Sequence, residues 1–153
     1  MGKRGSIIGG VGLLFGCYIL TLFWISGKQN PYLVQIDAKQ DYFMIDREWV
    51  GEEFEIPVVI HNTSWKAIAA EFRISLSYHL YALNQEEQTL LSIENIRTEP
   101  GQILPGEQKE VSMRITVPLE KGVYIFYVDL LEEGVTWYSE RGTKTKPIVV
   151  EVI

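Results

Sequence analysis

The sequence predicts an all-β domain, a seven-stranded antiparallel sandwich, preceded by one N-terminal transmembrane helix. Two observations support this fold class: the run from Ser6 to Ile25 carries no charge, and the rest of the chain alternates apolar and polar residues between turn-forming residues. A helix of about 20 residues matches the roughly 30 Å hydrocarbon core of a bilayer. Alternation with a period of two is typical of strands that bury one face.

The transmembrane helix is expected over residues 6–26, after a short basic N-terminus of residues 1–5. Lys3 and Arg4 precede the apolar run, whereas only Lys28 follows it closely. Because positive charge near a membrane helix favours the cytoplasmic side, we expect the N-terminus inside the cell. The chain would then be a single-pass protein of the cytoplasmic membrane, with its C-terminal domain extracytoplasmic, in the periplasm or at the cell surface.

Two other interpretations of the apolar run stay open. A cleaved signal peptide would have a shorter apolar stretch that ends at a small-x-small site. The run from Leu14 to Cys17 resembles a loose bacterial lipobox, in which the cysteine becomes acylated, but residues 18–25 are apolar where a lipoprotein usually continues with a polar linker. Gly12 and Gly16 form a small-xxx-small pair, which allows two membrane helices to pack closely.

Composition limits what the exterior part can be. Of the 14 basic residues, Lys3 and Arg4 precede the apolar run, which leaves 12 against 20 acidic residues. This balance argues against nucleic acid as a partner, because phosphate binding needs clustered Lys and Arg. Cys17 is the only cysteine, so the exterior domain contains no disulfide and must be stabilised by its core.

The exterior chain contains seven alternating segments separated by turn residues such as Gly, Pro and Asn. Their number and spacing indicate an immunoglobulin-like or fibronectin-like sandwich over residues 41–153, after a linker over 27–40. Tyr124, near the start of one segment, is placed for a tyrosine corner. The expected strands are 42–45 with 33–36 as an earlier piece, 53–61, 69–81, 89–96, 110–117, 123–131 and 147–152.

Several motifs in this region resemble bacterial extracytoplasmic Ig-like domains, which are related in style to the CARDB and fibronectin III-like domains of membrane and cell-envelope proteins. The resemblance covers roughly residues 51–152. It implies the fold and an envelope setting, but these domains share no catalytic residues that could be carried over. The motifs are Ile60–Trp65 (IHNTSW), Leu76–Tyr81 (LSYHLY), Leu104–Glu107 (LPGE), Gly122–Tyr124 (GVY) and Gly134–Gly142 (GVTWYSERG).

Candidate metal and catalytic residues are few. The two histidines, His61 and His79, fall on segments expected in opposite sheets and form no HxH or HxxH pair, so we expect no metal site. The paired acids Glu86–Glu87 and Glu132–Glu133 stand in turns, where acids are usually solvated, rather than across a cleft as a glycosidase requires. The sequence therefore predicts a non-catalytic protein without a cofactor.

Aromatic residues in two turns are the candidate binding residues. Trp65 lies between the segments 53–61 and 69–81, and Trp137 and Tyr138 lie before the last segment with Arg141 close by. These turns are expected at one end of the sandwich, the end at which the chain enters. Exposed Trp and Tyr provide a large contact area with little loss of rotamer entropy. The alternative is that these rings close the end of the core.

The sequence predicts an interaction module or accessory subunit of a membrane or cell-envelope complex, held in the lipid bilayer through residues 6–26. Trp65, Trp137, Tyr138 and Arg141 are the expected partner-binding residues, and Gly12 and Gly16 the expected helix-packing residues. The alternative function is carbohydrate binding, in which exposed aromatic loops bind a glycan. In that case Trp65, Tyr81 and Trp137 would stack on sugar rings while Asp129, Glu140 or Arg141 bind hydroxyl groups.

Overall fold

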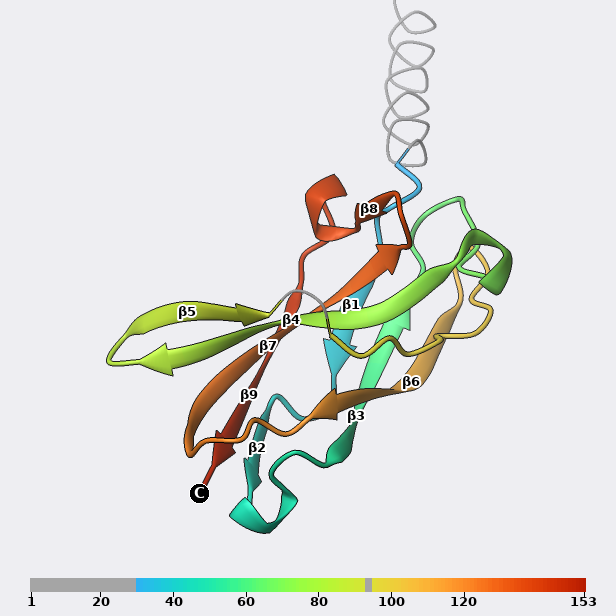
Figure 1. The fold of residues 1–153 in the computed structure, drawn as a ribbon. Coiled ribbons are helices and arrows are strands. Elements are labelled where there is room, and N and C mark those ends of the chain that lie inside the picture. Colours follow the sequence, from blue (N-terminus) through green and yellow to red (C-terminus); the bar gives the residue numbers. More distant parts are fainter. Residues whose placement is uncertain (1–29, 93–94) are drawn as a thin grey trace, which may run out of the picture.

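The computed structural model describes residues 30–92 and 95–153, which form a two-layer β-sandwich (Figure 1). Among these residues there is no helix of the length and apolarity that a membrane span requires. The predicted transmembrane helix over 6–26, with Gly12, Gly16 and Cys17, lies outside the described residues, as does the basic N-terminus over 1–5.

Nine strands and three short 3₁₀ helices make up the described chain. One sheet has the order β1-β3-β6, and the other has the order β2-β9-β7-β4-β5 with β8 paired to β7. The bounds are β1 Gln35–Ala38, β2 Tyr42–Ile45, η1 Arg47–Trp49, β3 Glu53–His61, η2 Ala70–Phe72, β4 Ile74–Asn84, β5 Glu87–Ser92, β6 Gln108–Thr116, β7 Gly122–Glu132, β8 Thr136–Trp137, η3 Ser139–Arg141 and β9 Lys146–Val152.

The strand count of seven was wrong because the first segment forms two strands in different sheets. β1 pairs with β3 in the three-stranded sheet, and after a short crossing β2 pairs with β9 in the other. The pairing of β2 with β9 is parallel, so the sandwich is not wholly antiparallel. The short strand β8, which was not expected, accounts for the other additional strand.

The linker expected over 27–40 was wrong at 35–38, because β1 is a strand of the domain and Ile36 is buried in its core.

The core lies between the two sheets and consists of the inward-facing residues that the alternation predicts. Along β3 these are Ile56, Val58 and Ile60, each fully buried. Their side chains share one face because successive residues of a strand point to opposite sides. Inward residues of the facing sheet complete the same cluster, among them Leu76, Tyr78, Phe126, Val128, Leu130, Ile148 and Val150.

Two further predictions concern the start of β4 and the tyrosine corner at Tyr124. The strand expected to begin at residue 69 begins at Ile74, because Ala70–Phe72 forms a 3₁₀ helix and Arg73 adopts a left-handed conformation with φ of 52°. The tyrosine corner is confirmed: the Tyr124 hydroxyl donates to the Glu120 carbonyl over 2.9 Å.

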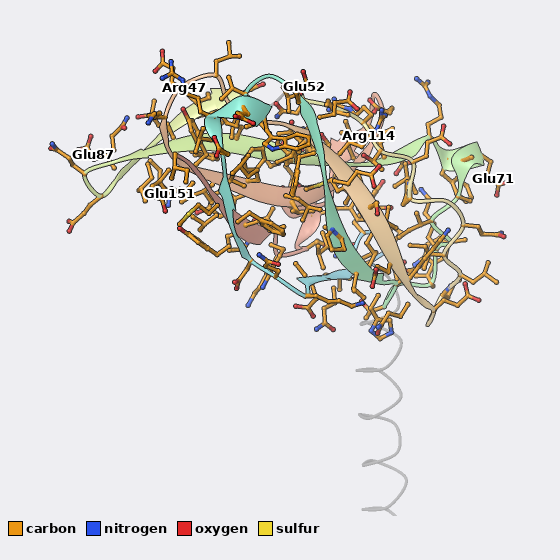
Figure 2. The ribbon with its side chains drawn as sticks, turned by 90° about the horizontal axis from the view of Figure 1, so that it is seen from below. Arg47, Glu52, Glu71, Glu87, Arg114 and Glu151 are labelled. Carbon is orange, nitrogen blue, oxygen red and sulfur yellow. The ribbon has the colours of Figure 1, made fainter. Side chains whose placement is uncertain are left out.

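A long β-hairpin of β4 and β5 projects beyond the rest of the sandwich (Figure 1). We call residues 81–91 the wing. Gln85 and Glu86 have φ of 47° and 79°, the positive values that a tight two-residue hairpin turn requires. Glu87 therefore stands at the far tip of the wing, on the opposite side of the molecule from Glu71 (Figure 2).

Candidate interaction site

Three segments that are distant in the sequence meet at one end of the sandwich, where the described chain begins (Figure 1). The Asn30 side-chain amide donates to the Arg141 carbonyl over 2.8 Å, and the Thr63 hydroxyl donates to the Leu33 carbonyl over 2.8 Å. We call this the proximal end; it consists of residues 30–34, the β3–β4 loop residues 62–66, and residues 137–144 between β8 and β9.

The β3–β4 loop is organised by the side chain of Asn62, which is fully buried. Its amide nitrogen donates to the carbonyls of Lys66 and Ile103 over 2.8 and 3.1 Å, and its oxygen accepts from the backbone N–H and hydroxyl of Ser64. A buried amide with these partners holds a loop in one conformation. The loop therefore presents Trp65 at its tip, where this side chain is 54% exposed.

Residues 137–144 are held by the buried carboxylate of Asp129 on β7. Its Oδ1 accepts from the backbone N–H groups of Leu130 and Ser139 over 2.8 and 3.1 Å, and its Oδ2 lies 3.1 Å from Nε2 of His79 on β4. Asp129 is fully buried, and such a group is tolerated inside a protein when its oxygens are hydrogen-bonded. It fixes the start of η3 relative to both strands.

Trp137 is half-buried against two polar side chains. Its ring lies 4.3 Å from the His79 ring, centroid to centroid, and the Arg97 guanidinium lies 5.5 Å from its centroid. Arg97 is itself paired with Glu133, with Nε 2.9 Å from the carboxylate oxygen. Trp137 thus has a fixed orientation, and only part of its surface faces solvent.

Tyr138 is not a contact residue, because it is only 1% exposed. Its ring packs edge-on against Tyr32 with centroids 5.1 Å apart. Burial raises the pKa of its hydroxyl above the ordinary value, and the nearby Glu132 carboxylate raises it further. The Tyr138 ring therefore closes the end of the core, which is the alternative given above for the aromatic turns.

Arg141 lies at the surface of the proximal end. Its guanidinium carbon is 5.8 Å from the centroid of the Tyr32 ring, within the range of a cation–π contact. Its backbone carbonyl accepts the Asn30 amide. Of the predicted contact residues, three have surface that a partner could reach at this end: Trp65, Arg141 and the solvent-facing part of Trp137.

The residues expected for carbohydrate binding lie on separate elements and differ in exposure. Tyr81 lies on β4 and meets Tyr127 edge to face, with an interplanar angle of 86°, whereas Trp65 lies in the β3–β4 loop. Asp129 is buried and bonded, and Glu140 receives a hydrogen bond from the Thr136 hydroxyl. Asp129 is therefore not available to bind a sugar hydroxyl.

The two histidines point to opposite sides of the sandwich, His61 on β3 in one sheet and His79 on β4 in the other. Within residues 30–92 and 95–153, no three side chains of His, Cys, Asp or Glu are grouped as metal ligands would be.

Sequence reasoning missed the residues that hold the proximal end together, namely Asn30, Asn62 and Thr143. The Thr143 hydroxyl accepts from the Val34 N–H over 3.1 Å and donates to the Tyr32 carbonyl. Asn62 precedes Thr63 and Ser64, a pattern typical of a solvent-exposed turn. The burial of the Asn62 side chain becomes evident only in the folded structure, where it bonds to the distant Ile103 carbonyl.

Several solved structures are similar to this chain. The CARDB domain of a Pyrococcus furiosus protein is 16% identical with a TM-score of 0.44, over 78% of this chain and 92% of that one. A PapD-like domain of a human protein is 13% identical with a TM-score of 0.39, over 80% and 86%. A β-glucosidase from Listeria innocua is 16% identical with a TM-score of 0.45, over 79% of this chain and 16% of that one.

No protein-family model and no curated protein matches the sequence. The structural neighbours include CARDB domains, the type of β-sandwich that the sequence resembles.

Proposed function

We propose that this chain is a single-pass membrane protein that presents one non-catalytic Ig-like domain outside the cytoplasmic membrane, as an accessory subunit of a membrane or cell-envelope complex. Residues 6–26 would span the bilayer with the N-terminus inside. Trp65, Trp137 and Arg141 at the proximal end would contact the partner, which we expect to be another membrane protein.

The observation that carries this proposal is the attachment of residues 30–34 to the proximal end. Asn30 is bonded to the Arg141 carbonyl, and Leu33 accepts the Thr63 hydroxyl. A helix ending near residue 26 would leave only a few residues before Asn30, and each residue spans at most about 3.6 Å. Trp65 and Arg141 would therefore stay close to the membrane surface, within reach of membrane-embedded chains.

Site-specific photo-crosslinking of the full-length chain in its native membranes tests this proposal. A photoreactive phenylalanine analogue at position 65 should give a discrete cross-linked product with another membrane protein. The double variant Trp65→Ala with Arg141→Ala should co-purify with that protein at a much lower yield in mild detergent, because an exposed tryptophan and an arginine are the usual centres of binding energy.

Trp49 provides a matched control. It is also 54% exposed, but it belongs to η1, which lies beside the C-terminal residue Ile153 at the other end of the sandwich (Figure 1). The photoreactive residue at position 49 should give no product, and Trp49→Ala should leave co-purification unchanged. Equal cross-linking from both positions, recovery of the chain alone in every detergent, or its release from vesicles by alkaline carbonate would refute the proposal.

A further inference from the structure

The two outer faces of the sandwich differ in chemistry. The outer face of the three-stranded sheet is polar and charged, with Asp37, Glu53, Glu55, Gln108, Glu110 and Arg114 exposed on it. The outer face of the six-stranded sheet carries a row of directly paired apolar and aromatic residues, one from each of β2, β9, β7, β4 and β5: Tyr42, Val149, Ile125, Tyr81 and Leu90. This row lies outside the core that the two sheets enclose.

The row ends at the wing in two exposed leucines. The register of β4 and β5 shifts between Leu80 and Tyr81, which leaves Leu91 as the extra residue of a bulge. A bulge re-aims side chains, and here both Leu90 and Leu91 remain about half exposed, at 49% and 50%. In the described chain β5 is the last strand of its sheet, so its outer edge pairs with no other strand.

A hollow of about 470 Å³ lies on the same face, between the wing and the segment that precedes β9. Tyr81 and Tyr127 meet in it with ring centroids 5.4 Å apart, and the Tyr127 hydroxyl donates to the Gln88 side chain over 3.0 Å. Ser139 and Thr145 line its other side. The face therefore combines a projection and a concavity side by side.

The charges of these two parts are opposite. Glu86 and Glu87 are exposed at the tip of the wing, where Figure 2 shows Glu87 reaching away from the domain. Lys144 is exposed and directly precedes Thr145 in the chain, Arg141 is exposed three residues earlier, and Glu140 is exposed next to Ser139. The wing therefore ends in two acidic residues, whereas the segment 139–145 beside the hollow carries two basic residues and one acidic residue, so the two parts have opposite net charge.

We propose that two copies of this chain associate through this face, with the wing of each lying across the hollow of the other. A two-fold symmetric contact uses the same patch on both partners, so the patch must be self-complementary. Here the two leucines would cover the partner's tyrosines while Glu86 and Glu87 meet the partner's Lys144. The inference goes beyond the proposed function, because it concerns a second copy of this chain and requires the wing, which the proposed function does not use; it holds for the domain with or without its membrane anchor.

Cross-linking between two differently tagged full-length chains, both carrying Cys17→Ser, tests the proposal. One chain carries Glu86→Cys and the other Lys144→Cys, and the two are reconstituted together and treated with a short bismaleimide. We expect a product that contains both tags, because the tip of one wing reaches the hollow of the other chain. The control pair replaces Glu86→Cys by Glu55→Cys, an exposed position on the opposite face, and should give a several-fold lower yield.

Charge exchange supplies a second measurement, the mass of the full-length protein by sedimentation in density-matched detergent. Glu86→Lys with Glu87→Lys should reduce the dimer fraction, Lys144→Glu should do the same, and the triple variant should restore it. Leu90→Asp, at an exposed site, should reduce it with an unchanged circular dichroism spectrum. Equal yields from the test and control pairs, failure of the triple variant to restore the dimer, or cross-linking of position 86 only to a different protein would overturn the proposal.

Discussion

Asp129 shows how one side chain determines the shape of the candidate site. It lies on the outward-facing side of β7 and yet is fully buried, with the start of η3 and the His79 side chain against it. Its Oδ1 accepts hydrogen bonds from the N–H groups of Leu130 and Ser139, and its Oδ2 lies within hydrogen-bond distance of Nε2 of His79. The His79 ring in turn packs against the Trp137 ring, so the carboxylate positions Trp137 through the imidazole of His79.

Replacing Asp129 by alanine should lower the free energy of unfolding by about 3 kcal/mol, because a buried group that loses its partner leaves donors unsatisfied. Asp129→Asn should cost less, since its amide oxygen can still accept from the Leu130 and Ser139 N–H groups. Urea unfolding of the full-length protein in detergent, followed by circular dichroism, measures both. Equal stability of the alanine variant and the parent would show that these bonds contribute nothing.

At the scale of elements, the decisive feature is the attachment of the chain before β1 to two loops. Tyr32 packs on Tyr138, the Leu33 carbonyl accepts the Thr63 hydroxyl, and the Val34 N–H donates to the Thr143 hydroxyl. These contacts come from elements at both ends of the sequence. They make the beginning of the described chain a part of the domain rather than a flexible tether.

Thr143→Val should release this attachment while keeping the shape of the side chain. The substitution removes the bonds of the threonine hydroxyl to the Val34 N–H and the Tyr32 carbonyl, which should cost about 2 kcal/mol. Hydrogen exchange should then become faster at the amides of residues 32–38 and stay unchanged in β7. Thr89→Val, in the exposed strand β5, is the control and should alter neither region; unchanged exchange at Val34 would contradict the expectation.

The whole molecule is stabilised without a disulfide in its described part, and its core includes three tyrosines whose hydroxyls sit in or near apolar surroundings. Burial raises the pKa of Tyr78, Tyr124 and Tyr138 above the ordinary value of 10.0. In the unfolded chain these phenols lose their protons near pH 10, while in the folded domain they keep them to higher pH. The unfolded state then binds fewer protons, so stability falls as pH rises.

The contribution of these tyrosines to the unfolding free energy should therefore be level below about pH 10 and decline above it, with a limiting slope of about 1.4 kcal/mol per pH unit for each of them. Tyr138→Phe should make this decline shallower, because the phenyl ring fills the same space without an ionisable group. Denaturant unfolding at a series of alkaline pH values provides the measurement. An identical pH profile for the variant and the parent would show that Tyr138 does not contribute.

The sequence predicts most of the sandwich because alternation is a local property. The strand expected over 53–61 has the observed bounds of β3, and its inward residues are the ones that the alternation assigns. The split of β1 from β2 could not be predicted, since both short segments alternate equally well and the choice of sheet depends on distant strands. At the proximal end, the bond between Val34 and Thr143 joins residues 109 positions apart and that between Asn30 and Arg141 joins residues 111 apart, separations that no local pattern reveals.

The division of the first segment between the two sheets bears on how the domain carries mechanical load. β1 and β2 both run away from the proximal end, alongside β3 and β9 respectively (Figure 1). Tension applied at residue 30 would act along these strands, so several ladder hydrogen bonds would be sheared together instead of being opened singly. A pull from the N-terminal side would therefore have to break several of these hydrogen bonds at the same time.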